Sequence, residues 1–324
     1  MPTLFVSTTG GHLTQLFAMS TRIPDIDDER VWVTHDNAQS RSLLDGEDVE
    51  FVPYIGVRDV RGVLASVPRA HRLLKKRNLT RVVSAGSGIA LGYLPYLAAR
   101  GVEAHYIESA ARASGPSSAG RLLRLVPRVN RYTQYRHLAA GRLRYVGSVF
   151  DGFVAADTPR PAVIRRAVVT IGTAEEFPFR RVLDALVPLL GPGGALERQQ
   201  GSAVDTLWQT GGTPTGGLGI APTPWIPATE LAGALATADL VVSHAGAGSA
   251  LSALQAGRCP VLIPRELAHG EVGDDHQGQL ATTLAQRGIA IHCTVGRMKT
   301  ADLIAAAGRS ITRPEHLPTM KLVS

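Results

Sequence analysis

Short apolar runs recur along the chain, and most are followed by a glycine-containing turn and then by a helical pattern. In the first half we predict strands at residues 4–7, 31–34, 49–52, 81–84 and 104–108. Helical patterns cover residues 13–19 and the stretch that ends at Ala99. Strands that alternate with helices at this spacing predict right-handed βαβ units and a parallel sheet.

The same pattern restarts after a proline-containing stretch at residues 151–161. Further strands are predicted at residues 167–171, 206–210, 239–243, 260–264 and 288–291. The chain is therefore expected to be α/β, with two doubly wound, Rossmann-like domains at residues 1–155 and 156–324. The last helix is a candidate to pack back on the first domain.

Composition excludes several classes of protein. The 324 residues are 44% hydrophobic, which excludes a disordered chain. Two cysteines, Cys259 and Cys293, make neither a disulfide framework nor a zinc-binding pair, so we expect reduced thiols in a cytoplasmic protein. Residues 82–99 carry no charge but contain three glycines and a proline, which suits a strand, a turn and a helix better than a membrane span. The N-terminus resembles no secretory signal.

The net charge of +7 is unevenly distributed. Residues 1–150 carry 20 Lys and Arg against 12 Asp and Glu, whereas residues 151–324 carry 14 against 15. Such a basic first half suits phosphates, anionic lipid headgroups or nucleic acid, or it is simply a solvated face. Four arginines have the three- and four-residue spacing of one helical face: Arg121, Arg124, Arg128 and Arg131.

Four glycine-rich turns follow predicted strands and suit phosphate binding. Glycine allows close approach of the backbone, and the next helix offers unpaired N–H groups and a positive dipole end. The turns are Gly10-Gly11, Gly86-Ser87-Gly88, Gly172-Thr173 and Gly246-Ala247-Gly248-Ser249. None matches a dinucleotide-binding or P-loop motif, which argues against a nicotinamide-dependent oxidoreductase and a P-loop ATPase.

Several motifs resemble a two-subunit glycosyltransferase of N-glycan and exopolysaccharide synthesis. Thr8 to Leu13, Gly86 to Gly88, Tyr106 to Arg112 and Gln134-Tyr135 resemble its membrane-associated acceptor subunit. Thr170 to Thr173, Phe177 to Phe179, Ser243 to Ser249 and Gly270 to Gln277 resemble its catalytic subunit. The chain thus looks like a fusion of both subunits and is more distantly similar to the MurG-like family 28 of glycosyltransferases.

The resemblance implies a GT-B fold, whose two domains face a cleft, and inverting transfer from a UDP-sugar without a metal. It implies donor-binding roles for Gly172, Thr173, Ser243, His244, Gly246, Gly248, Ser249, Asp274, Asp275, His276 and Gln277. It implies acceptor-binding roles for Gly10, Gly11, Gly86, Gly88, Glu108 and Arg112. The expected donor-binding half, residues 156–324, has no Asp-x-Asp motif for a bridging cation, so helix N-termini would oppose the charge of the UDP leaving group.

Individual residues keep alternative interpretations. His12 suits a general base for an acceptor hydroxyl, but it also suits a phosphate contact or a helix cap. Glu108 either contacts the acceptor or pairs with Arg112. The Asp274 to Gln277 segment is either a sugar-binding set or a helix N-cap. Arg265 either pairs with a uronate carboxylate or is a surface charge.

The acceptor is expected to be a polyprenyl-diphosphate-linked saccharide, and the donor sugar N-acetylglucosamine or glucuronic acid. In the MurG-like pattern a glutamate binds the ribose, but Ser252 stands at that position, which weakens the uridine assignment.

The usual acceptor subunit begins with a membrane-spanning segment, which we do not find here. Peripheral contact with the inner face of an anionic membrane would then depend on the arginines and on Leu122, Leu123, Leu125 and Val126. Alternatives are a soluble acceptor, a UDP-GlcNAc 2-epimerase and a non-catalytic sugar-nucleotide-binding subunit; nucleic-acid binding lacks a supporting motif.

Overall fold

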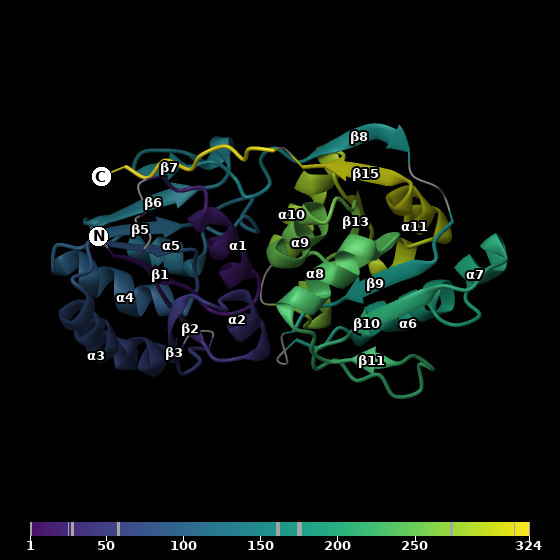
Figure 1. Cartoon of the computed structure of the whole chain (residues 1–324), viewed down its shortest axis with the longest axis horizontal. Coiled ribbons are helices and arrows are strands. Elements are labelled where there is room, and N and C mark those ends of the chain that lie inside the picture. Colours follow the sequence, from purple (N-terminus) through teal and green to yellow (C-terminus); the bar gives the residue numbers. More distant parts are fainter. Residues whose placement is uncertain are drawn as a thin grey trace. The chain divides into compact units, whose positions relative to one another are not determined.

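The computed structural model describes residues 2–24, 26, 29–56, 59–159, 163–173, 177–272, 275–313 and 315–323. The chain divides into two compact units (Figure 1). Unit 1 comprises Met1–Asp151 and His316–Ser324, and unit 2 comprises Gly152–Glu315. The last helix belongs to unit 2, and the residues that return to unit 1 are the non-helical C-terminal segment.

Unit 1 contains a seven-stranded, all-parallel sheet with the order β3-β2-β1-β4-β5-β6-β7. Its strands are β1 (Thr3–Val6), β2 (Arg30–His35), β3 (Asp48–Val52), β4 (Arg81–Ser84), β5 (Glu103–Ile107), β6 (Val129–Thr133) and β7 (Leu143–Tyr145). Its helices are α1 (Gly11–Ser20), α2 (Ala38–Leu43), α3 (Val60–Arg77), α4 (Gly88–Ala99) and α5 (Ser118–Leu123). The strand order reverses direction between β1 and β4, which is where doubly wound folds bind ligands.

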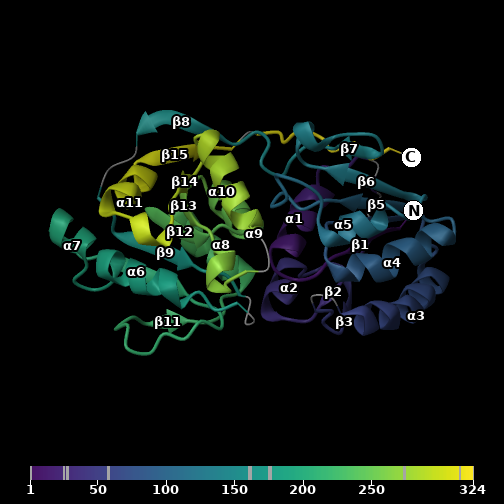
Figure 2. The same cartoon turned by 180° about the vertical axis from the view of Figure 1, so that it is seen from behind.

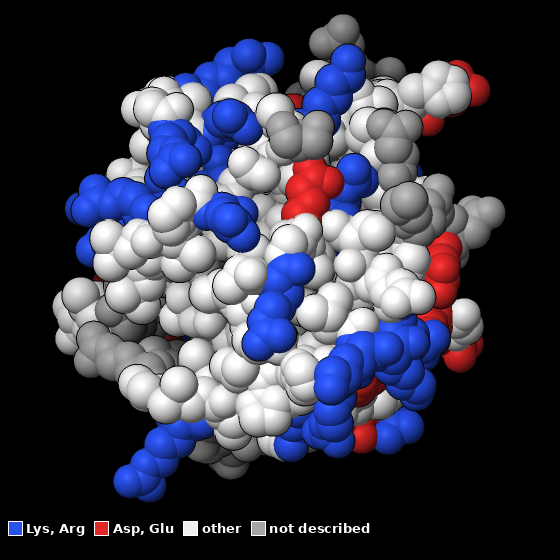
Figure 3. Space-filling view, turned by 90° about the vertical axis from the view of Figure 1, so that its left-hand side faces the viewer, with Lys and Arg blue, Asp and Glu red and all other residues white. Residues whose placement is uncertain are grey.

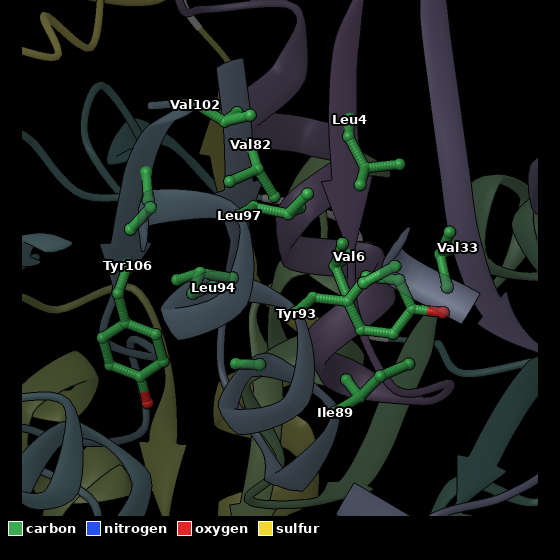
Figure 4. Packing of buried hydrophobic residues seen from close by; sticks show 14 of the residues in the cluster. Leu4, Val6, Val33, Val82, Ile89, Tyr93, Leu94, Leu97, Val102 and Tyr106 are labelled. Carbon is green, nitrogen blue, oxygen red and sulfur yellow. The ribbon is translucent and has the colours of Figure 1, made fainter. Parts of the chain in front are cut away.

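Both faces of this sheet are covered. Tyr93, Leu94 and Leu97 of α4 are fully buried against Leu4 and Val6 of β1 and their neighbours (Figure 4). On the opposite face Phe5 stacks on Trp32, which also contacts Phe17 of α1. Because the side chains of a strand alternate between faces, adjacent residues of β1 supply both layers.

Unit 2 contains a six-stranded parallel sheet with the order β11-β10-β9-β12-β13-β14. Its strands are β9 (Arg166–Thr170), β10 (Asp205–Gln209), β11 (Pro222–Thr223), β12 (Leu240–His244), β13 (Pro260–Ile263) and β14 (Ile291–His292). A separate antiparallel pair joins β8 (Val154–Pro159) to β15 (Arg309–Thr312). Its helices are α6 (Arg180–Leu190), α7 (Ala195–Gln200), α8 (Ala228–Thr237), α9 (Ala247–Gln255), α10 (His276–Gln286) and α11 (Thr300–Ala307).

Two hydrophobic clusters cover the faces of the second sheet. Val169 and Val242 pack with α6, α7 and α11 in one cluster. Val168 and Val241 pack with α8 and α9 in the other. The neighbouring strands β9, β12, β13 and β14 are seen in this order in Figure 2. The predicted doubly wound architecture is confirmed in both units.

Some predictions about single elements are wrong. The helix expected to carry four arginines ends at Leu123, and Arg131 lies on β6 instead. The last parallel strand is β14 rather than residues 288–291. The strands β6, β7, β8, β11 and β15 were not predicted at all. Their runs are short or rich in polar residues, so local hydrophobicity carries little signal for them.

In the part of the chain that the structure describes, no helix is both long enough and apolar enough to cross a membrane. The uncharged stretch at residues 82–99 forms β4, a turn and α4, as expected from its glycines and proline. Cys259 and Cys293 are both buried free thiols.

Candidate functional site

His12 lies where the turns after β1 and β4, the central strands of the first sheet, come together. It occupies the first turn of α1, and its Nδ1 lies 2.9 Å from the carbonyl oxygen of Ala85. A carbonyl oxygen only accepts hydrogen bonds, so Nδ1 carries the proton and donates it. In the neutral imidazole Nε2 is then the basic nitrogen, which is the form that a general base needs.

Gly86 makes room for this imidazole. A Cβ atom at Gly86 would lie 2.9 Å from Cε1 and 3.0 Å from Nδ1 of His12. Its φ of +120° also disfavours any side chain. The next residue, Ser87, has a φ of 74° although it is not glycine, so the turn after β4 is a strained segment.

The remaining glycines predicted to bind the acceptor lie at the same edge. Gly10 has a φ of +80°, and its N–H donates to Oε1 of Gln39 over 2.7 Å. Gly11 and Gly88 are the first residues of α1 and α4. A Cβ atom at Gly88 would lie 3.3 Å from Ile55. The structure thus brings Gly10, Gly11, Gly86, Gly88 and His12 to one edge of the sheet, while their binding roles stay predictions.

Glu108 is deeply embedded, with 3% of its surface exposed. Its carboxylate accepts hydrogen bonds from the Ser117 N–H, 3.3 Å from both oxygens, and from the Tyr106 hydroxyl at 3.5 Å. A Cβ atom at Gly120 would clash with it at 1.7 Å. Burial raises the pKa of Glu108, and the Ser117 bonds and the nearby Arg112 charge oppose this shift. These contacts give Glu108 a clear part in ordering the loop at residues 108–117.

Two glutamines hold this loop in place, and the sequence patterns predicted a role for neither of them. Gln15 of α1 accepts a hydrogen bond from the Ala110 N–H over 2.8 Å and donates to the Ser109 hydroxyl over 3.0 Å. Gln134 donates to the Glu108 carbonyl and accepts from the Val149 N–H. These partners are far apart along the chain, so no local pattern could have revealed them.

In unit 2 a second histidine occupies a related position. Nδ1 of His244, at the end of β12, lies 3.4 Å from the Thr170 carbonyl at the end of β9. Two glycines leave space for its ring: a Cβ atom at Gly172 would lie 2.9 Å from it, and one at Gly246 would lie 2.3 Å from it. Gly172 also has a φ of +88°. The turns after β9 and β12 therefore meet around one imidazole.

The helix α9 begins directly at this point, with Gly246 as its N-cap. Gly248 and Ser249 lie in its first turn, where backbone N–H groups have no partner within the helix. Ser243 is buried, and its hydroxyl donates to the His244 carbonyl over 2.7 Å. Thr173 follows Gly172 and is half-buried. This arrangement is well suited to bind an anion.

The predicted sugar-binding segment opens α10. Asp275 is the N-cap residue and is exposed, and His276 is half-buried in the first turn. Gln277 is buried, and its Oε1 accepts a hydrogen bond from the Arg265 N–H over 3.0 Å. Gln277 thus positions the segment after β13. Asp274 lies outside the described residues.

Arg265 is not a surface charge, since only 5% of its surface is exposed. Burial lowers its pKa to about 10, which still leaves the guanidinium charged near neutral pH. Burial and this neighbouring positive charge lower the pKa of His244 to about 3. The imidazole of His244 is therefore neutral near pH 7, and Arg265 is the cation beside it.

No group of three or more His, Cys, Asp or Glu residues suited to a metal ion occurs among the residues that the structure describes. Among these residues, the groups that could bind or act on a ligand are imidazoles, a guanidinium, helix N-termini and glycine turns.

The two units, each built on a parallel sheet, form an α/β chain with the GT-B fold. Solved structures with this fold match the chain. The structure of MurG from Acinetobacter baumannii matches with a TM-score of 0.56 at 18% identity, covering 94% of this chain and 88% of that one. UDP-GlcNAc 2-epimerase from Methanocaldococcus jannaschii, solved with UDP-GlcNAc and UDP, also matches with a TM-score of 0.56, at 12% identity over 94% and 91% of the chains. The fold alone therefore does not choose between transferase and epimerase.

The sequence makes that choice at the level of family. Residues 222–321 match the glycosyltransferase family 28 C-terminal domain. A stretch of 58 residues is 40% identical to "UDP-N-acetylglucosamine transferase subunit ALG13" from Yarrowia lipolytica, covering 18% of this chain and 28% of that relative. The fold is GT-B, residues 222–321 match a family 28 domain, and the expected resemblance to this family is confirmed.

The lowered pKa of His244 predicts how stability depends on pH. The unfolded chain binds a proton at this histidine below about pH 6.5, whereas the folded chain resists protonation until about pH 3. The free energy of unfolding should therefore decrease as the pH falls through this window, and His244→Asn should make the decrease shallower. Denaturant unfolding at a series of pH values measures this. The control His269→Asn removes an exposed imidazole and should keep the wild-type slope; equal slopes in all three proteins would contradict the prediction.

Proposed function

We propose that the protein is an inverting glycosyltransferase that moves a sugar from a UDP-sugar to a lipid-linked saccharide. The family 28 match at residues 222–321 carries this proposal, because it includes α9 and the opening of α10. The function divides between the units: unit 2 binds the donor, and unit 1 binds and activates the acceptor.

The donor diphosphate binds at the N-terminus of α9 in this proposal. The first turn of α9 offers backbone N–H groups that have no partner within the helix, so phosphate oxygens can bind there. Negative charge that develops on UDP as it leaves is stabilised by the dipole of α9. Asp275 and His276 supply donors and acceptors for sugar hydroxyls, together with Asp274, Thr173 and Ser249.

His12 is the proposed general base. Its Nδ1 proton is held by the Ala85 carbonyl, so Nε2 accepts the proton of the acceptor hydroxyl. The hydroxyl oxygen then attacks the anomeric carbon, and the bond to UDP breaks with its electron pair remaining on the diphosphate. A single displacement of this kind inverts the anomeric configuration. Glu108 and Arg112 act by ordering the loop beside the acceptor.

A lipid-linked acceptor is supported by an exposed apolar pair within a basic surface. Leu122 is 53% exposed and Leu125 is 73% exposed, between the exposed Arg121, Arg124 and Arg128. Leu123, in contrast, is buried in the core. On the face shown in Figure 3, Lys and Arg side chains gather in several places while Asp and Glu are sparse. Leucines among arginines suit an anionic membrane surface, where the lipid diphosphate of the acceptor would be found.

A panel of nucleotide sugars tests the proposed donor class. UDP and UDP-sugars should raise the melting temperature, because a single-site ligand at 100 times its Kd stabilises by about 2.7 kcal/mol. ADP-glucose and GDP-mannose are the matched controls and should shift melting less. Absence of any shift with UDP-sugars would contradict the donor assignment. Release of a 2-epimerised sugar from UDP-GlcNAc without an acceptor would favour the epimerase instead.

Loss of the base should separate turnover from donor binding. His12→Gln should lower kcat about 10²–10⁴-fold, because general-base catalysis contributes about that much, and should leave UDP affinity unchanged. Gly86→Ala should also lower kcat, since its Cβ would displace the His12 ring. Gly101→Ala is the control, with a φ of +87° and no atom within 4 Å of the added Cβ. Turnover of His12→Gln within a few-fold of wild type would assign the base elsewhere.

Co-sedimentation with vesicles tests the membrane contact. Wild type should pellet with anionic vesicles at low salt and less at high salt, because each basic residue near the surface contributes about 1 kcal/mol. The double variant Leu122→Ser, Leu125→Ser should pellet less, whereas Leu267→Ser, which changes an exposed leucine of unit 2, should match wild type. Equal and negligible pelleting on all vesicles would favour a soluble acceptor and leave the donor assignment intact.

A further inference from the structure

The side chain of Arg265 lies across the carboxyl end of a neighbouring strand. Arg265 follows β13, and its Nη2 donates to the carbonyl oxygen of Ile171, just after β9, over 2.8 Å. The strand order is β9-β12-β13, so the guanidinium spans the end of β12. That end carries His244 and leads directly into α9. The guanidinium thus lies at the place where the α9 dipole also presents positive potential.

Among the described residues no acid forms a direct ion pair with this buried cation, although the charge of Glu271 partly opposes the effect of burial on the pKa of Arg265. The Nε atom of Arg265 is buried and has no hydrogen-bond partner. The nearby acid, Glu271, is held by Arg181 in two hydrogen bonds of 3.0 Å and 2.9 Å. The ring of Phe179, with its centroid 5.6 Å from the guanidinium carbon, offers only a weak cation–π contact.

A buried charge of this kind is costly unless an opposite charge compensates it. Two features give positive potential at the same point: the guanidinium and the N-terminus of α9. The neutral imidazole of His244 does not supply an anion. A ligand that brings negative charge would therefore be stabilised there.

We propose that Arg265 binds an anionic oxygen group of the donor, a proposal that rests on the proposed function. The group is either a phosphate of UDP, common to every UDP-sugar, or the carboxylate of a uronic acid. The position across the end of β12 places the guanidinium beside the proposed diphosphate site. The backbone N–H of Arg265 donates to Gln277, so this residue also adjoins the proposed sugar-binding segment. Both sources offer the same chemistry, a charge-assisted hydrogen bond to a planar or tetrahedral oxyanion.

Calorimetric titration with UDP, UDP-glucose and UDP-glucuronate tests this role. The variants are Arg265→Met, Arg265→Lys and the control Arg198→Met, which removes an exposed arginine of unit 2. Hydrogen bonds to charged groups contribute about 1.5–3 kcal/mol, so the Kd of Arg265→Met should rise about 10- to 150-fold. Arg265→Lys keeps the charge, so its Kd should rise less. It replaces the methionine variant in the test if that variant does not fold. The control should keep the wild-type Kd.

The pattern across ligands identifies the group. Equal loss for all three ligands assigns a phosphate, and loss confined to UDP-glucuronate assigns the sugar carboxylate. The ligand-free melting temperature of Arg265→Met should equal or exceed that of wild type, because a buried charge without a direct ion-pair partner is removed. A lowered melting temperature with unchanged Kd for all three ligands would show a purely structural role and overturn the proposal. If wild type binds none of the ligands, the proposed function fails together with this inference.

Discussion

The arrangement of both candidate sites depends on the parallel direction of the strands. In a parallel sheet every strand ends at the same edge, so turns that are far apart along the chain meet there. Helices must cover both faces, and the two units meet this requirement with separate hydrophobic clusters on α1 and α4, or on α6 and α8. The packed faces leave the carboxyl edge as the part of each sheet that is open to chemistry. His12, His244 and Arg265 all lie at such edges.

Each unit uses an imidazole to link the turns after its two central strands. His12 bonds the carbonyl of Ala85 after β4, and His244 lies against the carbonyl of Thr170 at the end of β9. In both cases a glycine with positive φ, Gly86 or Gly172, leaves the space that the ring occupies. The histidine follows the first central strand in unit 1 but the second in unit 2. A similar local solution thus serves proton transfer in one proposed role and phosphate binding in the other.

Charge is balanced differently at the two edges. In unit 1 the buried carboxylate of Glu108 is met by hydrogen bonds from Ser117 and Tyr106 and orders a loop. In unit 2 the acid Glu271 bonds to Arg181, and Arg265 is a buried cation next to a neutral histidine. In the proposed transfer, fixed positive charge would stabilise the leaving group, and a helix N-terminus offers such charge. Both α9 and Arg265 lie within residues 222–321, the region that matches family 28.

The amino-acid pattern alone predicts the alternation of strands and helices, the restart of this alternation near residue 160 and the glycine turns that follow the strands. These are local properties, because burial of a whole strand or of a helix face shows in neighbouring residues. The strands β6 and β7 escaped notice, since only Val129 and Tyr132 of β6 carry large buried side chains among polar neighbours. Which groups meet is visible only in the folded chain: His12 bonds a carbonyl 73 residues away along the sequence, and Arg265 bonds one 94 residues away. These contacts depend on strand order and register, which no local pattern of hydrophobic residues encodes.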